Sequence, residues 1–324
     1  MDMEDYVFST DGGIIQQFQT QIKMRHNGSV EQFISMPSVL DGENCMHITY
    51  DWLYDFAVSA CQHRDEVYLY MTSLANSKPF VNGPHPSSAK RAAGMQTQGD
   101  IFILVDVDEE PSILSREGGV LIYAINHNIN EPELFDELDF IDTNDLLAAQ
   151  GWTYGDQVFI GNAHLVYTNE SEVYRIAITE LRNGVFFVDF KWRRGMREIE
   201  VLKIEFLDLR QELFNDHLPM PNMAFFEAVT VSNQYYDPLF KYWDVELIVT
   251  TRNFHIFQID CNFDQTGTLL YHKISKVFYR YGFYETTNYI KTFDGYFAVA
   301  QKLPFIYETY EKYSRQVLTV YDTS

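Results

Sequence analysis

Four aspartates lie near the ends of strand-like segments: Asp106, Asp189, Asp237 and Asp260. A glycosidase needs two or three carboxylates that converge on one sugar, separated by about 5 to 10 Å. None of the four recurs at an equivalent position in several segments, and each adjoins an expected turn. Aspartate at a turn ordinarily bonds to nearby backbone. We therefore predict turn capping and no catalytic residue, with a hydrolase of sugars or lactones as the alternative.

The sequence offers little for metals or cofactors. Asp106–Glu110 alternates oxygen ligands but lacks the glycine and the terminal glutamate of a calcium loop. His255 has Cys261 six residues on and no second pair nearby, which is typical of a core histidine. Gly12 and Gly13 lie between two strand-like runs, as in a hairpin turn rather than a phosphate loop. We predict no metal and no cofactor.

The charge of the chain limits its partners. Its 46 acidic and 24 basic residues give a formal net charge of −22. Nucleic-acid binding rewards positive patches because counterions are released, and anionic membranes also attract basic surfaces. We therefore expect partner proteins with basic surfaces, no nucleic acid and no membrane insertion.

Cysteines and the first residues of the chain predict an intracellular protein. Cys45, Cys61 and Cys261 show no CxxC spacing and are most simply interpreted as reduced core thiols. The opening MDMEDYVF has neither the basic nor the apolar region of a signal peptide, and no apolar run approaches a membrane span. These features favour a cytoplasmic location.

The elements that would position any site follow one recurring strand pattern. Its first apolar residues Val67, Val120 and Val173 lie about 53 residues apart, and similar segments begin near Phe254 and Val317. The copies read EVYLYMTS, GVLIYAIN, EVYRIAIT, NFHIFQID and QVLTVYDT. With 16% aromatic residues, the composition suits strands. This repeat predicts a single all-β domain over residues 1–324, a β-propeller of five or six four-stranded antiparallel blades.

Two stretches predict whole blades. The first has the strand-like runs Gln157–Asn162, His164–Asn169, Glu172–Thr179 and Gly184–Lys191. The second has Ala224–Ser232, Val245–Thr251, Phe254–Cys261 and Gly267–Ser275. Between them, Glu198–Phe206 is expected to be a strand followed by a short helix, or the start of a helix that runs through LDLRQELFN.

The last unit offers only three strands, Asn288–Phe293, Tyr296–Gln301 and Gln316–Thr323. The strand-like Tyr6–Thr10 has no obvious upstream neighbour. Closure would remove exposed sheet edges. We therefore predict that the N-terminal strand completes the last blade; the alternative is that the chain is a fragment of something longer.

The C-terminal QVLTVYDTS resembles the third strand of a WD-repeat blade, with Tyr321-Asp322 where that family carries Trp-Asp. The four runs of Gln157–Lys191 are also similar to that family. The resemblance implies a propeller that acts as an interaction scaffold.

Two expected insertions are candidate partner-binding surfaces. Asn76–Gly99 is rich in Pro, Gly and Ser and locally basic, and Asn130–Gln150 is acidic with apolar residues among its carboxylates. Long loops without their own structure tend to be functional or disordered. The alternatives are a tolerated insertion and an outer strand or helix. The candidate residues are Lys78, Phe80, His85, Lys90, Arg91, Leu134, Phe135, Asp136, Leu138, Asp139 and Phe140. We predict a non-enzymatic scaffold or assembly subunit, either free-standing or part of a larger complex.

Overall fold

A computed structural model describes seventeen stretches of the chain. They are residues 3–8, 14–18, 21–25, 32–35, 44–74, 80–107, 118–128, 130–150, 158–166, 168, 172–215, 226–239, 241–251, 255–279, 290–293, 296–302 and 316–322. The chain divides into two compact units, and each is described by itself. One comprises Met1–Asp142 with Arg194–Glu198, and the other Thr143–Arg193 with Ile199–Ser324.

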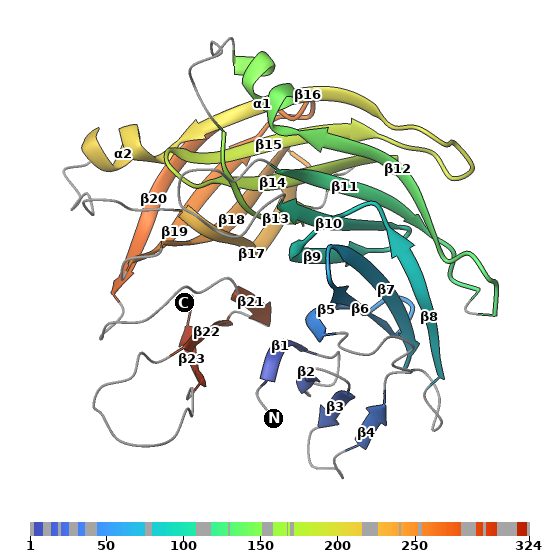
Figure 1. Cartoon of the computed structure of the whole chain (residues 1–324). Helices are drawn as coiled ribbons and strands as arrows, with labels where there is room; N and C mark the ends of the chain where they lie inside the picture. Colours follow the sequence, from blue (N-terminus) through green and yellow to red (C-terminus); the bar gives the residue numbers. More distant parts are fainter. Residues whose placement is uncertain are drawn as a thin grey trace. The chain divides into compact units, whose positions relative to one another are not determined.

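The first unit holds three four-stranded antiparallel sheets whose strands follow one another in chain order (Figure 1). The first sheet consists of β1 (Met3–Phe8), β2 (Ile14–Phe18), β3 (Gln21–Arg25) and β4 (Gln32–Ser35). The second consists of β5 (Asn44–Asp51), β6 (Phe56–His63), β7 (Glu66–Ser73) and β8 (Phe80–Ser87). The third consists of β9 (Ala92–Gln98), β10 (Ile101–Val107), β11 (Gly118–Ile125) and β12 (Phe135–Asp142).

The second unit holds two four-stranded sheets and one of three described strands. The first sheet consists of β13 (Ile160–Val166), β14 (Val173–Glu180), β15 (Gly184–Lys191) and β16 (Glu200–Asp208), with α1 (Thr143–Gln150) before it and α2 (Leu209–Asn215) after it. The next consists of β17 (Phe226–Asp237), β18 (Tyr242–Thr251), β19 (His255–Phe263) and β20 (Leu269–Tyr279). The last consists of β21 (Ile290–Phe293), β22 (Tyr296–Lys302) and β23 (Gln316–Asp322).

Within each unit, the hydrophobic core lies between consecutive sheets. Middle strands carry continuous apolar runs because both of their faces are covered: all seven residues of β10 are buried, as are the first seven of β15. One buried cluster joins the β13–β16 and β17–β20 sheets through side chains such as Phe187, Leu247 and Phe263. Another joins the β5–β8 and β9–β12 sheets through Leu69, Leu104 and others. Outer strands are mostly exposed or half-buried; in β12 only Leu138 and Ile141 are buried.

The recurring strand pattern is confirmed as a set of β-strands. Four copies are the third strand of their sheet, namely β7, β11, β19 and β23. The copy that begins at Val173 differs, because it is β14, the second strand of its sheet. This offset of one strand, together with the β16 and α2 segments, explains why the copies that begin at Val173 and Phe254 are farther apart in the chain than the earlier ones. Five four-stranded sheets and a sixth sheet of three described strands agree with the expected five or six blades.

The boundaries expected around the Val173 copy are corrected. The runs Gln157–Asn162 and His164–Asn169 form parts of one strand, β13, because residues Ile160–Val166 extend without a turn. The fourth strand is β16, so the expectation of a strand followed by a short helix is right. The four strands expected in the next sheet are confirmed as β17 to β20.

The expected closure by the N-terminal strand is wrong. β1 pairs antiparallel with β2, with Phe8 opposite Ile14. The hairpin expected at Gly12-Gly13 explains this, because it returns the chain beside β1; the turn residues themselves lie outside the described residues. A short hairpin pairs at a smaller cost in chain entropy than a contact between the ends of the chain.

The two expected insertions are largely regular structure. Asn76–Gly99 supplies β8 and β9, the outer strand of one sheet and the first strand of the next. Asn130–Gln150 supplies β12 and α1. Proline and glycine in the first stretch suggested a loop, but β8 is an outer strand, where proline is tolerated because one edge has no partner to bond.

The expectation of three reduced thiols is also corrected. Cys45 and Cys61 lie opposite each other on β5 and β6 and form a disulfide. The buried Cys261 is free, and burial raises the pKa of its thiol. Within the described residues, neither helix has the length and apolar composition that a membrane crossing requires.

Candidate functional site

The first candidate site is a hollow in the second unit, called here the Trp243 hollow. Its volume is about 260 Å³, and its walls include Val173, Leu202, Tyr236, Trp243 and Asp264. These residues come from the β13–β16 sheet on one side and from the β17–β18 hairpin and the β19–β20 turn on the other. Both sheets belong to the same unit. Apolar, aromatic and acidic groups thus share one concave surface.

A buried ion pair forms part of the wall. Arg175 Nε and Nη2 donate to the two carboxylate oxygens of Asp189 at 2.6 and 2.7 Å, and both side chains are more than nine-tenths buried. The Arg175 guanidinium also lies 4.0 Å from the ring centre of Phe263. Paired hydrogen bonds and an aromatic face offset the cost of burying these charges. The two charges therefore compensate each other within the β13–β16 sheet, and Phe263 of the β17–β20 sheet covers the guanidinium.

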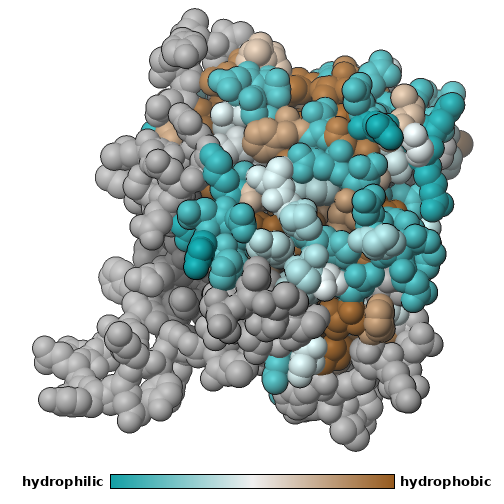
Figure 2. Space-filling view, turned by 45° about the vertical axis from the view of Figure 1, so that its right-hand side comes forward, coloured by the Kyte–Doolittle hydropathy of each residue, from teal (hydrophilic) through white to brown (hydrophobic). Residues whose placement is uncertain are grey.

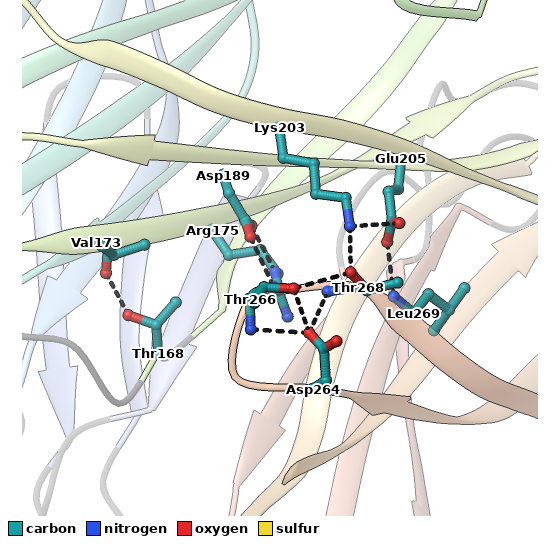
Figure 3. Close-up of polar contacts among 10 residues, drawn as sticks. All are labelled: Thr168, Val173, Arg175, Asp189, Lys203, Glu205, Asp264, Thr266, Thr268 and Leu269. Carbon is teal, nitrogen blue, oxygen red and sulfur yellow. Dashed lines mark hydrogen bonds and ion pairs between the residues drawn. The ribbon is translucent and has the colours of Figure 1, made fainter. Parts of the chain in front are cut away.

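The β19–β20 turn brings a second carboxylate to the hollow (Figure 3). Asp264 Oδ1 accepts hydrogen bonds of 2.8 Å from Thr266 N, Thr266 Oγ1 and Thr268 N. Burial opposes ionisation of this carboxyl, but the hydrogen bonds from Thr266 and Thr268 together outweigh it, so the pKa of Asp264 lies below its ordinary value. The group is negatively charged at neutral pH.

Gly267 explains why this turn fits against the ion pair. Its φ is +78°, which glycine adopts without strain. A Cβ there would lie 2.0 Å from Asp189 Oδ2 and 2.4 Å from Arg175 Nη2. The expected runs Phe254–Cys261 and Gly267–Ser275 bracket this turn correctly. Nothing in the sequence linked Gly267 to Arg175 and Asp189, which are far away in the chain.

Lys203 and Glu205 on β16 also bind the end of the β19–β20 turn, at Thr268 and Leu269. Lys203 Nζ lies 2.7 Å from Glu205 Oε1 and donates to Thr268 Oγ1 at 2.6 Å. Glu205 Oε2 accepts from Leu269 N at 2.7 Å. Lys203 therefore has its own carboxylate, as Arg175 does.

A second candidate lies in the first unit, in the turn between β5 and β6. Trp52 and Leu53 are 59% and 58% exposed. The buried Asp51 holds their backbone: its Oδ1 accepts from Leu53 N and Tyr54 N at 2.8 and 3.0 Å, and its Oδ2 accepts from Gly99 N at 2.8 Å. We call residues 52–54 the Trp52 turn.

Tyr54 anchors the Trp52 turn to the neighbouring sheet. Its ring stacks on His127 with centroids 3.7 Å apart, and His127 Nε2 lies 2.7 Å from Asp100 Oδ1. Asp55 adopts a φ of +53° and accepts a 2.7 Å hydrogen bond from Tyr50. This turn was not predicted from the sequence. The available signal was DWLYD, in which three large apolar residues lie between two aspartates.

Exposed apolar side chains are scattered elsewhere. The face drawn in Figure 2 is largely hydrophilic, with separate hydrophobic patches. Single exposed apolar residues are ordinary in proteins. Two exposed apolar pairs, Val201-Leu202 and Leu270-Tyr271, lie on the strands β16 and β20. The Trp52 turn differs because three adjacent large side chains are exposed at a turn whose backbone Asp51 holds.

The four aspartates considered first have structural partners. Asp237, the last residue of β17, caps nearby backbone as expected, since its Oδ1 accepts from Leu239 N at 2.8 Å. The turn assignment is wrong for the other three. Asp106 lies within β10, and its Oδ1 accepts, at 3.0 and 2.9 Å, from Lys90 N and Arg91 N, which are distant in the chain. Asp189 lies within β15 and pairs with Arg175, while Asp260 lies within β19 and accepts from Ser275 at 3.1 Å.

Other candidates for chemistry are also packed. Among the described residues, no group of three or more histidine, cysteine, aspartate or glutamate side chains could hold a metal ion. Residues 108–110 of the acidic run lie outside that part. His255 is half-buried at the start of β19 and is therefore not a core residue; its ring stacks on that of Phe257 with centroids 5.9 Å apart.

The described residues among the predicted partner-binding set lie on the outer strands β8 and β12 of the first unit or beside them: Lys90 and Arg91 lie between β8 and β9, and Leu134 directly precedes β12. Leu134 and Leu138 are buried, so they are core residues and not contact residues. The ring of His85 meets that of Phe135 at 5.5 Å, and burial lowers the pKa of His85. Phe80, Lys90, Asp136, Asp139 and Phe140 are exposed, and Arg91 is half-buried. Lys78 lies outside the described residues.

Comparisons with known proteins show the fold. No protein-family model matches the chain, and no curated protein matches it. The β-propeller domain of Nup133 from Vanderwaltozyma polyspora is similar, with a TM-score of 0.50, 11% identity, and coverage of 91% of this chain and 79% of that one. Together with the five four-stranded antiparallel sheets, this likeness shows a β-propeller.

Two other solved structures are similar at a lower score. Sqt1 from Saccharomyces cerevisiae has a TM-score of 0.44 and 10% identity, with coverage of 93% of this chain and 81% of that one. A putative 6-phosphogluconolactonase from Bacteroides uniformis has a TM-score of 0.45 and 8% identity, with coverage of 98% and 95%.

Proposed function

We propose that this propeller is a non-enzymatic interaction subunit that binds partner proteins. The observation that carries the proposal is the Trp52 turn. Large apolar side chains at the centre of an interface commonly supply most of the binding energy. Because Asp51 already fixes the backbone of the turn, binding would cost little additional ordering.

The packing of the aspartates supports a binding role over a hydrolytic one. A sugar hydrolase needs carboxylates that face a substrate together. Asp106 and Asp237 are engaged with backbone groups, and Asp189 with Arg175. The net charge of −22 favours partners with basic surfaces, which it would also attract over a distance. The cytoplasmic location favoured by the sequence is not part of this proposal, because the Cys45–Cys61 disulfide removes the argument from reduced thiols.

The test compares partner capture by variants. The purified protein, a Trp52→Ser/Leu53→Ser variant and a Leu270→Ser/Tyr271→Ser variant are each immobilised and exposed to an extract of the source cells. Leu270 and Tyr271 are a matched control because they are 60% and 55% exposed but lie on a strand. Retained proteins are quantified by mass spectrometry.

We expect a defined set of proteins on the wild-type chain and on the Leu270/Tyr271 control, and its loss from the Trp52/Leu53 variant. Equal retention by all three chains would exclude the Trp52 turn as the contact. Turnover of glycosides or lactones by the wild-type protein would overturn the non-enzymatic assignment.

A further inference from the structure

The charges around the Trp243 hollow leave one carboxylate without a cation. Arg175 is bound by Asp189, and Lys203 by Glu205. Among the described residues, Asp264 forms hydrogen bonds but no ion pair. The positive charge of Lys203 acts on it from a greater distance and helps to lower its pKa. A surplus negative charge therefore lies at the wall of a partly enclosed space.

The other walls suit a cation that carries an alkyl stem. The rings of Tyr236 and Trp243 lie with centroids 5.1 Å apart and tilted by 43°. Aromatic faces attract ammonium and guanidinium groups through the ring quadrupole. Leu202, which is 48% exposed, and Val173 offer apolar surface to the methylene groups of such a side chain.

We propose that the Trp243 hollow binds an arginine or lysine side chain of a partner protein, with the cation between Asp264 and the aromatic pair. Arg175 does not oppose this, because Asp189 neutralises it and its guanidinium lies over Phe263. The inference rests on the proposed function, since it assigns the chemistry of one contact. It concerns the second unit, whereas the Trp52 turn belongs to the first.

The first experiment compares three isolated side chains on the full-length protein. N-acetyl-arginine amide, N-acetyl-lysine amide and N-acetyl-citrulline amide are titrated while the indole N–H resonance of Trp243 is followed by NMR, assigned by its loss in Trp243→Phe. Citrulline has nearly the shape of arginine without the charge. We expect both cationic amides to shift the resonance and to bind at least about fivefold more tightly than the citrulline amide, as a desolvated cation–π contact implies.

Two results would overturn the inference. One is a citrulline affinity equal to that of arginine, or no shift with either cation. The other comes from a fourth titration, with choline: choline that binds as tightly as the arginine amide would indicate a small free cation instead of a protein side chain.

Variants locate the contact. Asp264→Asn removes the charge and keeps the size, and we expect about fivefold weaker binding of the arginine amide. The matched control is Asp244→Asn: this exposed carboxylate accepts a 2.8 Å hydrogen bond from Asn262 and is not part of the hollow. The Asp244→Asn variant should bind the arginine amide as tightly as the wild type does. An equal loss of affinity in both variants would contradict a defined site at Asp264.

Tyr236→Leu provides a second measure that leaves the β19–β20 turn intact. It keeps an apolar wall but removes one aromatic face, so cation binding should weaken while the thermal midpoint stays near that of the wild type. Unchanged cation affinity in a folded Tyr236→Leu variant would overturn the aromatic part of the site. If the hollow binds no cation but partners are still captured through the Trp52 turn, this inference fails and the proposed function stands.

Discussion

Arg175 and Asp189 form two parallel hydrogen bonds, of 2.6 and 2.7 Å, inside the β13–β16 sheet. The register of β14 and β15 places the two residues directly opposite each other. The next sheet covers them with Phe263 and Gly267. The contact therefore links the pairing of two strands to the packing of two sheets.

Removing one member of this pair should destabilise the protein strongly. Arg175→Met leaves the Asp189 carboxylate buried without its cation, which costs about 3 to 5 kcal/mol of unfolding free energy. Urea denaturation measures the change. Arg193→Gln is the control, because its pair with Glu172 lies at the surface and should leave the midpoint almost unchanged. Equal stability of both variants would show that the buried pair contributes nothing.

Gly267→Ala should damage the same contact from the opposite sheet. The new methyl group would overlap Asp189 and Arg175, in addition to the strain of alanine at a φ of +78°. Gly195→Ala separates these effects, because Gly195 has a φ of +91° and no atom within 4 Å of a Cβ. We expect about 1 to 2 kcal/mol for Gly195→Ala and a clearly larger loss for Gly267→Ala by urea denaturation. Similar losses would mean that the ion pair moves aside without cost.

Local sequence signals identified the β17–β20 sheet almost completely. Its strands alternate or run apolar as expected, and the Asp264–Gly267 turn stops one strand and starts the next through its own hydrogen bonds. The short helix α2 after β16 followed from good helix formers in LDLRQELFN. These features depend on neighbours in the chain, so one sequence was enough to predict them.

Features that depend on the register of paired strands, or on contacts between residues far apart in the chain, were not predicted from the sequence. Cys45 pairs with Cys61 because a hairpin register puts them opposite each other, and a bulge lies beside the pair. The spacing of 16 residues alone does not reveal that register. The partner of Asp189 likewise follows from the β14–β15 register, and the Trp243 hollow from the meeting of two sheets.

The Cys45–Cys61 disulfide should stabilise the first unit. Its loop spans 16 residues, for which the chain-entropy account gives about 3 kcal/mol. We expect a lower thermal midpoint for Cys45→Ala/Cys61→Ala, and a similar fall when the wild-type protein is heated with a reductant. Cys261→Ala is the control, since reductant should still lower the midpoint of that variant. Alkylation under denaturing, non-reducing conditions should modify one cysteine per chain; three modified cysteines would contradict the disulfide.

Glu180 should make the stability of the second unit depend on pH. Its side chain is fully buried, and burial raises its pKa above the ordinary 4.5, although the backbone N–H groups of Arg182, Asn183 and Phe159 oppose the shift. A raised folded-state pKa means that the native protein binds the proton more tightly than the unfolded chain does. Folding is therefore penalised at neutral pH, and the penalty is relieved as the pH falls through the folded-state pKa towards 4.5.

The measurement is urea denaturation of the wild-type protein and of Glu180→Gln between pH 7.5 and pH 5. The variant has no proton to bind at this site, so the wild type should gain stability relative to it as the pH falls. Comparing the two chains cancels the titration of the other groups. The hydrogen bonds lost in Glu180→Gln lower its free energy of unfolding by the same amount at every pH, so they do not change how the difference between the two curves varies with pH. Curves that stay parallel over this range would show that Glu180 titrates alike in the folded and unfolded chains. A separation that widens towards pH 5 in favour of the wild type would establish the buried carboxyl as the source.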